Sequence, residues 1–303
     1  MATSILITGA SGLIGTRLTE ILLKAGYRVV HLGRAQKAGS IPCFVWNVEK
    51  GKMDLKSLEG VDAIIHLAGA GVAEKRWSRQ RKREILESRT KSTALLFDAL
   101  KKSSHKVKTV VSASAIGYYG CDLEQEVVTE EGKPGEDFLS KVVMAWEHAV
   151  DDIASLGIRV SKIRIGIVLS EKGGALKEMA APIKWGVGSP LGTGKQVVSW
   201  IHLDDLCYMF LKVIEDTSMS GAYNGVSVQP VTNVIMTKSI AKILKCPLWL
   251  PSVPTFVLKL ILGEMADIVV NGRNVSSEKI QRTGFKFRFS NLEDALRDLL
   301  KVA

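Results

Sequence analysis

Short apolar runs alternate with segments of helical periodicity through the first half of the chain. Six runs have strand length and end at turn residues, at positions 4–8, 28–32, 43–48, 61–67, 109–112 and 160–169. Three intervening segments carry apolar residues at helical spacing, at positions 13–22, 85–100 and 140–154. This alternation predicts an α/β protein with a right-handed, doubly wound parallel sheet, the Rossmann fold.

The pattern becomes looser after about residue 165. Residues 186–194 are rich in Gly and Pro and predict a loop over a pocket, and Asp204 or Asp205 is expected to cap a helix. Further helices are expected at positions 232–244, 254–262 and 291–302. We therefore expect a Rossmann domain at residues 1–165. Residues 166–303 should form a smaller C-terminal α/β part that binds substrate and is partly interleaved with the first.

A glycine-rich turn joins the first predicted strand to the first helix. Gly9 permits a tight turn, Gly12 lets a ligand approach the backbone, and Gly15 lets the helix pack close to its strand. The free N–H groups of the helix N-terminus favour a pyrophosphate there. Turn glycines of an ordinary strand–helix junction are the alternative. The predicted dinucleotide contacts in this turn are Gly9, Ser11, Gly12, Leu13, Ile14 and Gly15.

The second predicted strand ends in Gly33-Arg34, and no acidic residue lies between positions 28 and 41. An acidic side chain there would accept a hydrogen bond from the ribose 2′-hydroxyl of NAD, whereas an arginine can pair with a 2′-phosphate. The planar guanidinium of Arg34 suits a phosphate. We therefore predict NADP as the cofactor; an exposed loop arginine without that role is the alternative.

The fourth predicted strand is followed by small residues at positions 68–71. Ligands in open parallel sheets lie at the carboxyl ends of the strands, so Leu67, Ala68 and Gly69 are predicted to run beside the cofactor. His66 lies within the strand, and we interpret it as a core histidine with its hydrogen bonds satisfied.

The composition is that of an ordinary globular protein: 303 residues, 46% hydrophobic and 24% charged, with a formal net charge of +10. The densest basic run, at positions 75–83, is interpreted as the solvated start of a surface helix, with a polyanion-binding patch as the alternative. The four cysteines form no Cys-x-x-Cys pair, which indicates reduced thiols, a cytoplasmic location and no metal site. No segment suggests a signal peptide or a membrane span.

Taken together, several motifs resemble the extended short-chain dehydrogenase/reductases. The similarity is strongest to the NADP-binding, epimerase-like subgroup often described as nucleoside-diphosphate-sugar epimerases or cell-division-inhibitor-like proteins. It rests on the glycine turn and on Ser-Ala-Ser-Ala-Ile-Gly-Tyr-Tyr-Gly at 112–120. It also rests on Lys141 through Trp146-Glu147, on Arg164-Ile-Gly-Ile-Val-Leu, and on Ser-Trp-Ile-His-Leu-Asp-Asp-Leu at 199–206.

The resemblance implies roles for particular residues. Relatives carry a Tyr-x-x-x-Lys motif in which the lysine holds the nicotinamide ribose and the tyrosine exchanges a proton with the substrate. Lys141 and Ser114 match the lysine and the hydroxyl that orients substrate, but the tyrosine position holds Asp137. Tyr118 or Tyr119 could supply a displaced phenol, so Tyr118 and Asp137 remain alternative proton-handling groups. Arg89 occupies a position where relatives often have Asn.

Three functions are compatible with these residues. The first is an NADP(H)-dependent oxidoreductase or epimerase acting on a small hydroxyl- or carbonyl-bearing substrate, with nucleotide sugars as one class. The second is an NADP-binding sensor with little or no catalysis, favoured by the missing tyrosine. The third, nucleic-acid binding through residues 75–83, rests on charge alone and is the weakest. The sequence leaves a homodimer open.

Overall fold

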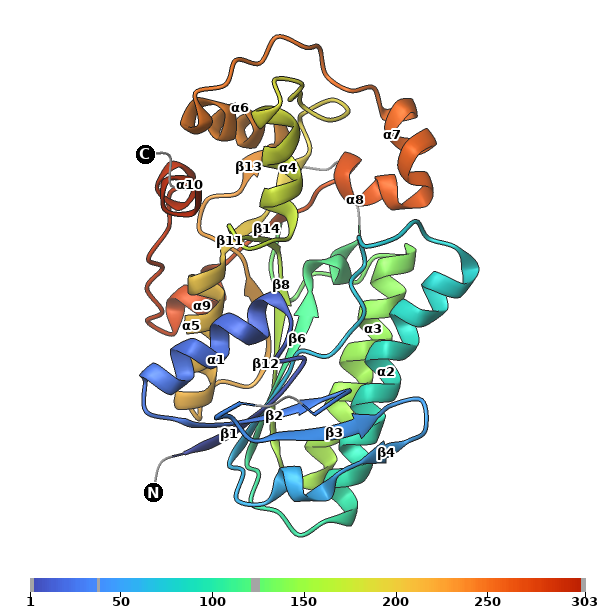
Figure 1. Cartoon of the computed structure of the whole chain (residues 1–303), viewed down its shortest axis with the longest axis vertical. Helices are drawn as coiled ribbons and strands as arrows, with labels where there is room; N and C mark the ends of the chain where they lie inside the picture. Colours follow the sequence, from blue (N-terminus) through green and yellow to red (C-terminus); the bar gives the residue numbers. More distant parts are fainter. Residues whose placement is uncertain (1–2, 37–38, 121–125, 301–303) are drawn as a thin grey trace.

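The computed structural model of the chain describes residues 3–36, 39–120 and 126–300 (Figure 1). Its main sheet has eight strands in the order β12-β8-β6-β5-β1-β2-β3-β4. Every neighbouring pair is parallel except β3 and β4. The strands are β1 (Ser4–Thr8), β2 (Arg28–Gly33), β3 (Cys43–Asn47), β4 (Lys52–Met53), β5 (Ala63–His66), β6 (Thr109–Ala115), β8 (Arg159–Ile165) and β12 (Gly221–Gly225). This confirms the predicted doubly wound α/β fold.

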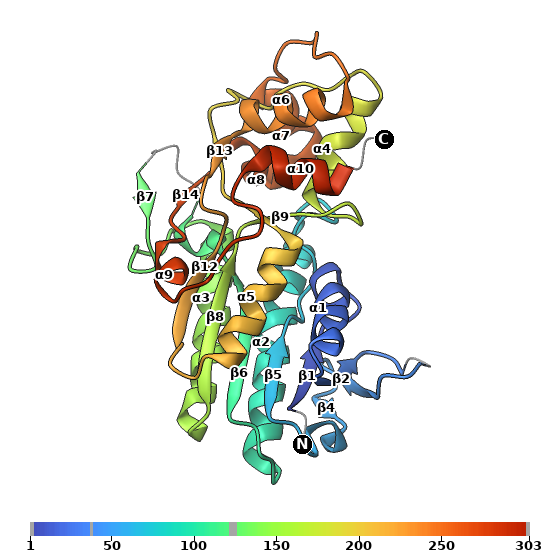
Figure 2. The same cartoon turned by 90° about the vertical axis from the view of Figure 1, so that its left-hand side faces the viewer.

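Helices cover both faces of the sheet (Figure 2). Helices α1 (Leu13–Lys24) and α5 (Leu203–Glu215) pack together on one face, and α2 (Arg79–Lys102) and α3 (Phe138–Asp151) pack together on the other. Arg17 of α1 forms a two-bond ion pair with Asp204 of α5, with N···O distances of 2.7 and 2.8 Å. Because all the strands except β4 run parallel, their carboxyl ends share one edge of the sheet.

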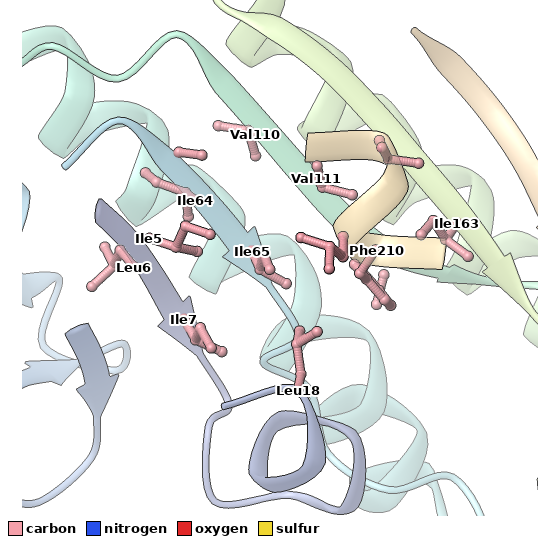
Figure 3. Close-up of a cluster of buried hydrophobic side chains, with 14 of the residues drawn as sticks. Ile5, Leu6, Ile7, Leu18, Ile64, Ile65, Val110, Val111, Ile163 and Phe210 are labelled. Carbon is pink, nitrogen blue, oxygen red and sulfur yellow. The ribbon is translucent and has the colours of Figure 1, made fainter. Parts of the chain in front are cut away.

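The main core lies between the sheet and these helices (Figure 3). The middles of β1 and β5 are continuously apolar, as expected for a sheet buried on both faces. Ile5, Leu6 and Ile7 of β1 have no exposed surface, and neither do Ile64 and Ile65 of β5. Burial of each such side chain contributes about 1.5–3 kcal/mol relative to exposure, and the resulting rigidity fixes the strand ends where the loops begin.

The C-terminal part has its own apolar cluster, which includes Trp200, Met236 and Leu296. Its helices are α4 (Ala175–Lys184), α6 (Asn233–Leu244), α7 (Thr255–Leu262), α8 (Asp267–Val270), α9 (Glu278–Arg282) and α10 (Leu292–Leu300). Three two-stranded sheets pair β9 (Ile167–Leu169) with β11 (Trp200–His202), β10 (Val197–Val198) with β13 (Val231–Thr232), and β7 (Val127–Val128) with β14 (Asn274–Val275). Short 3₁₀ helices are η1 (Leu55–Leu58), η2 (Ile116–Tyr119), η3 (Asp152–Leu156) and η4 (Gly263–Ala266). The helices expected near 232–244, 254–262 and 291–302 are therefore confirmed as α6, α7 and α10.

The single strand predicted at 160–169 is wrong, because Gly166 divides it. β8 stays in the main sheet, whereas β9 leaves it and pairs with β11. A Cβ at Gly166 would lie 2.3 Å from the carbonyl oxygen of Ser199, so only glycine fits this crossing. The chain later returns to the main sheet as β12, so residues beyond 165 also contribute a strand to it.

The predicted cap of α5 is also wrong. The N-cap is His202, whose Nδ1 accepts a hydrogen bond from the Asp204 N–H. Asp205 instead accepts hydrogen bonds from the backbone N–H groups of Arg288 and Phe289, and it is fully buried. Both aspartates therefore hold distant segments in place, a use that local sequence does not reveal.

Candidate functional site

The glycine-rich turn lies at the carboxyl end of β1 and leads into α1. Gly9 has φ +68°, and a Cβ at Gly15 would stand 2.5 Å from the Gly9 carbonyl oxygen, so both positions require glycine. Gly12 is different. It is exposed, and a Cβ there would meet no nearer protein atom than that same oxygen at 3.4 Å. The cradle above Gly12 is thus open, as a pyrophosphate would need.

The residues around Gly12 complete this cradle. Ser11 is exposed, and Leu13 and Ile14 are half-buried in the first turn of α1. The first backbone N–H groups of a helix have no intrahelical partner, so those of Leu13, Ile14 and Gly15 are available as donors. The turn as a whole fits the phosphates of a dinucleotide.

Arg34 follows the last residue of β2 and is exposed. Within the described part of the chain, its guanidinium makes no hydrogen bond or ion pair. It stands at the carboxyl edge of the strand next to β1, where a dinucleotide's adenosine half lies in this fold. An arginine placed there without a protein partner fits a ligand phosphate.

The loop after β5 is held by a buried polar cluster. The Thr8 hydroxyl accepts hydrogen bonds from the N–H groups of Leu67 (3.1 Å) and Ala68 (3.2 Å), and it lies 2.8 Å from His66 Nδ1. His66 also contacts the Thr93 hydroxyl at 3.1 Å. Burial lowers the pKa of His66 to about 4, so the ring is neutral at neutral pH. The interpretation of His66 as a satisfied core histidine is confirmed.

This loop also packs directly on the glycine-rich turn. A Cβ at Gly9 would lie 2.9 Å from the carbonyl carbon of Leu67, which shows how closely the two backbones approach. Gly69 is exposed beyond that contact. Leu67 and Ala68 therefore lie against the glycine-rich turn and Gly69 next to them, while their contact with a dinucleotide stays a prediction.

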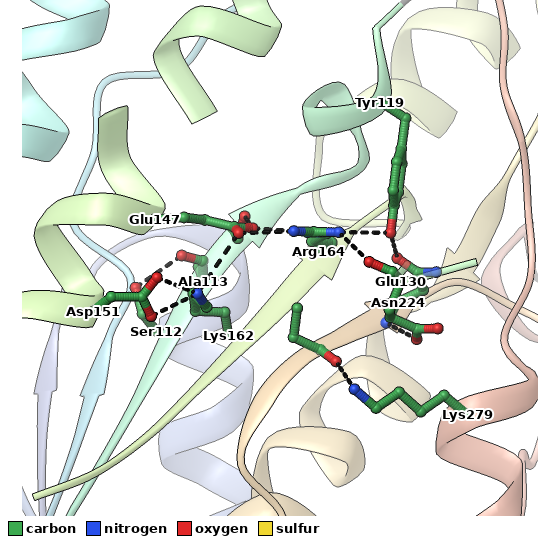
Figure 4. A network of polar contacts seen from close by, with 12 residues as sticks. Ser112, Ala113, Tyr119, Glu130, Glu147, Asp151, Lys162, Arg164, Asn224 and Lys279 are labelled. Atoms are coloured by element: carbon green, nitrogen blue, oxygen red, sulfur yellow. Dashed lines mark hydrogen bonds and ion pairs between the residues drawn. The ribbon is translucent and has the colours of Figure 1, made fainter. Parts of the chain in front are cut away.

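Ser114, at the end of β6, does not point its hydroxyl into open space. It is 3% exposed and donates a 2.6 Å hydrogen bond to Glu147 of α3. Glu147 also accepts two hydrogen bonds from Arg164 of β8, at 2.8 and 2.9 Å (Figure 4). Burial alone would raise the pKa of Glu147, but the hydrogen bonds from Arg164 and Ser114 hold it below its ordinary value.

The same network reaches the tyrosine pair in η2. Arg164 donates to the Tyr119 hydroxyl at 2.9 Å, and Tyr119 donates to Asn224 of β12 at 2.7 Å. Burial raises the pKa of Tyr119 to about 12, and the side chain is 2% exposed, so it is a packed structural phenol. Tyr118 is half-buried, with the Arg164 guanidinium 3.5 Å from its ring centroid. Its hydroxyl has no hydrogen-bond partner among the described residues.

Asp137 and Lys141 lie at the start of α3. Asp137 is the N-cap: one carboxylate oxygen accepts hydrogen bonds from the Ser140 N–H at 2.8 Å and from its hydroxyl at 3.0 Å. Lys141, in the first turn, is exposed, and its ammonium group has no partner within the described ranges. The structure thus brings Tyr118, Asp137 and Lys141 to the same edge of the sheet. The structure also makes Asp137 the N-cap of α3, a role that the resemblance did not predict.

The basic run at 75–83 is only partly the helix start expected from sequence. Helix α2 begins at Arg79 after the N-cap Ser78, and Arg81 is buried and paired with Glu74 and Glu84. Lys82 pairs with Glu264 of η4. Several of these charges are therefore used inside the molecule, which weakens the polyanion-patch alternative.

Two residues of the candidate site form a pair that the sequence did not predict. The sequence shows Glu147 and Arg164 only as parts of separate motifs. In the structure they form a buried ion pair, and Arg164 also donates to the Tyr119 hydroxyl (Figure 4). A signal was present. Glu147 follows Trp146 on the buried face of α3, Arg164 lies between Ile163 and Ile165, and buried charges occur in proteins almost only when paired.

The described part of the chain contains no cluster of three or more His, Cys, Asp or Glu residues able to hold a metal ion. Cys43, Cys207 and Cys246 are free thiols, while Cys121 lies outside the described residues. None of the described helices has both the length and the apolar character that crossing a bilayer requires.

Known proteins resemble this chain over nearly its whole length. The NAD dependent epimerase/dehydratase family model matches residues 5–225, and a domain of unknown function, DUF1731, matches residues 253–299. Epimerase family protein YfhF of Bacillus subtilis is 36% identical over 299 residues, which cover 98% of each chain. An epimerase family protein of Staphylococcus aureus, SA0724, is 35% identical with the same coverage.

Solved structures of epimerase-like proteins also resemble this chain over nearly its whole length. The human epimerase family protein SDR39U1, crystallised with NADPH, superposes with a TM-score of 0.89 at 28% identity, covering 99% of this chain and 100% of that one. A nucleoside-diphosphate sugar epimerase from Corynebacterium glutamicum gives a TM-score of 0.82 at 30% identity, where the match covers 99% of this chain but 58% of that one. Together with the open glycine turn and the strand-end residues above, these matches show that the chain belongs to the NAD dependent epimerase/dehydratase family of extended short-chain dehydrogenase/reductases.

Proposed function

We propose that the protein is an NADP(H)-dependent epimerase or oxidoreductase whose substrate is a small hydroxyl- or carbonyl-bearing molecule, with nucleotide sugars as the first class to test. The observation that carries the proposal is Arg34, exposed and without a partner among the described residues, on the same sheet edge as the open cradle at Gly12. The human relative solved with NADPH supports the choice of NADP.

The residues that would hold the cofactor form one line along the sheet edge. Arg34 would pair with the 2′-phosphate, and the turn at Gly9, Gly12 and Gly15 would receive the pyrophosphate. Lys141 would donate to the nicotinamide ribose. When bound, NADP supplies a hydride acceptor or donor at the nicotinamide C4.

Tyr118 is the better candidate for moving the proton. Its hydroxyl has no hydrogen-bond partner in the described ranges, so it is available to a substrate oxygen. Asp137 spends a carboxylate oxygen on two hydrogen bonds from Ser140, which require that oxygen as an acceptor. The Ser114 hydroxyl already donates its hydrogen bond to Glu147. It would therefore act on a substrate as a hydrogen-bond acceptor, or by positioning the end of β6.

The proposal divides binding between the two parts of the chain. We assign cofactor binding to residues 1–165 and the substrate-binding surface to the C-terminal part, 166–303, which lies beyond the carboxyl edge of the main sheet (Figure 1). β12 couples the two, because it belongs to the main sheet while its residue Asn224 contacts Tyr119 of η2.

The test measures cofactor binding first and then screens candidate substrates. The purified protein is titrated with NADPH and NADH, then incubated with NADP and a panel of nucleotide sugars, and separately with NADPH and simple carbonyl compounds. We expect tighter binding of NADPH and either cofactor turnover or inversion of one sugar carbon. Tyr118→Phe should retain NADPH binding and lose turnover, whereas turnover equal to that of the unmodified protein would exclude Tyr118 as the proton-handling group.

An NADP-binding sensor is the second candidate. Two observations favour it: the Ser114 hydroxyl is bonded to Glu147, and Asp137 at the tyrosine position is a helix cap. The same screen separates the two functions. A sensor would bind NADPH with no turnover of any substrate, and Tyr118→Phe would change nothing.

A further inference from the structure

Arg89 of α2 is a cation with an incomplete set of partners. Its Nη1 donates to the carbonyl of Ile85 at 2.9 Å, and its guanidinium lies over the Trp146 ring, with Cζ 5.1 Å from the centroid. Its Nε and Nη2 make no hydrogen bond to any described residue. Burial, with a smaller effect from the nearby charge of Arg81, lowers the pKa of Arg89 to about 10, so it remains protonated at neutral pH.

Several other cations set into this fold have a compensating carboxylate or a set of carbonyl partners. Arg164 pairs with Glu147, Lys162 with Asp151, and Arg81 with two glutamates. Arg159 has no such carboxylate but donates to three backbone carbonyls, those of Met219, Val213 and Ile214. Arg89 has one carbonyl and one aromatic face. Withdrawing a charge from water without a compensating anion is unfavourable, so this arrangement calls for a reason.

The position of the guanidinium supplies that reason. A Cβ at Gly69 would lie 3.2 Å from Arg89 Cζ, so the group sits directly against the exposed turn of the loop that follows β5. That turn is fixed on α2, because the Ala70 N–H donates to the Ser88 hydroxyl at 3.0 Å. Two residues before Gly69, Leu67 packs on Gly9 of the phosphate turn. The unused donors of Arg89 therefore border the path assigned to the ligand.

Arg89 is half-buried, and neither its Nε nor its Nη2 is a fully buried nitrogen of the kind that the Arg81 Nε is. The guanidinium therefore lies against the exposed Gly69, where a ligand along the 67–69 loop would meet it. An arginine fork presents paired N–H groups that match the geometry of phosphate or carboxylate oxygens.

We propose that Arg89 is an oxyanion-binding residue that completes its hydrogen bonding with phosphate or carboxylate oxygens of the ligand held along the 67–69 loop. The inference rests on the proposed function only in taking that crevice as the ligand site. The oxyanion can come from the dinucleotide itself or from the substrate.

Arg89→Met keeps a long side chain to pack on Trp146 but removes the charge and all donors, and Arg89→Lys restores a charge. Arg282→Met is the matched control, because Arg282 is exposed and pairs only with Glu278 on its own helix among the described residues. Each protein is titrated calorimetrically with NADPH, with inorganic pyrophosphate, and with UDP-glucuronic acid after saturation with NADPH. Unfolding of the ligand-free proteins in urea is measured in parallel.

We expect Arg89→Met to weaken binding of at least one oxyanion ligand by about tenfold or more, the effect of losing a hydrogen bond to a charged group. Arg89→Lys should recover part of the loss and Arg282→Met should show none. Weaker NADPH binding would assign the oxyanion to the dinucleotide, and a loss confined to UDP-glucuronic acid would assign it to the substrate. The ligand-free Arg89→Met protein should be at least as stable as the unmodified one, because it no longer holds an uncompensated cation.

Unchanged affinity for all three ligands would overturn the inference, and so would a less stable protein that binds normally, since Arg89 would then be structural. Failure of the proposed function looks different. The unmodified protein would then bind no NADPH, while the pyrophosphate titration would still test Arg89 on its own.

Discussion

The hydroxyl of Ser114 donates a 2.6 Å hydrogen bond to a carboxylate oxygen of Glu147, and so ties the end of β6 to α3. Arg164 donates hydrogen bonds both to Glu147 and to the Tyr119 hydroxyl. The network therefore links Ser114 to Tyr119 (Figure 4). The residue expected to orient substrate is thus one end of a buried ionic network.

Removing one partner of this network should be costly. In Glu147→Leu, Arg164 keeps its charge in a site where it is 4% exposed, and loss of one partner of a buried pair typically costs about 3–5 kcal/mol. Urea denaturation measures this. Glu278→Leu removes the exposed partner of Arg282 and should change stability by less than about 1 kcal/mol. Equal effects of the two substitutions would show that the buried network contributes nothing special.

His66 should make stability depend on pH in a defined window. Its pKa falls from 6.5 in the unfolded chain to about 4 in the fold because the ring is buried. The unfolded state therefore binds the proton first, and stability falls as pH decreases from about 6.5 to about 4 and is constant below that. The loss should be of the order of 3 kcal/mol. His66→Gln should flatten this window in urea unfolding; an unchanged slope would rule out His66 as its source.

Arg34 should select NADP over NAD. Arg34→Ala is expected to weaken NADPH binding by about 1.5–3 kcal/mol, the contribution of a hydrogen bond to a charged group, and to leave NADH binding unaltered. Arg28→Ala is the matched control, since Arg28 is exposed at the opposite end of the same strand. Fluorescence titration with both cofactors decides the point. Parallel losses for NADPH and NADH would mean that Arg34 does not read the 2′-phosphate.

Gly12 and Gly15 should respond oppositely to an added methyl group. Gly12 has φ −77° and an open Cβ position, so Gly12→Ala should fold with nearly normal stability but lose dinucleotide affinity. A Cβ at Gly15 would collide with backbone at 2.5 Å, so Gly15→Ala should lower the melting temperature. Circular dichroism melts and NADPH titration of both proteins test this. Normal NADPH affinity in Gly12→Ala would displace the phosphate site from this turn.

The sequence by itself determined the first five strands, the strand–helix alternation of the first half and the glycine turn. These features are local: apolar runs with turn boundaries specify buried strands, Gly9 has a positive φ, and Gly15 leaves room for the backbone of Gly9 and Ala10. The position of Arg34 also follows from the sequence, because a residue after a parallel strand must lie at the carboxyl edge of the sheet.

Only the tertiary structure decided which side chains meet. The break of the sixth strand at Gly166 is imposed by Ser199, and the roles of Asp204 and Asp205 are set by segments more than 80 residues away on either side. Glu147 and Arg164 are 17 residues apart but belong to a helix and a strand that meet only when the sheet is assembled. Burial, and with it the need of each charge for a partner, is a property of that assembly. Local sequence therefore cannot show that Glu147 has hydrogen-bond donors on both carboxylate oxygens while two nitrogens of Arg89 have no acceptor among the described residues.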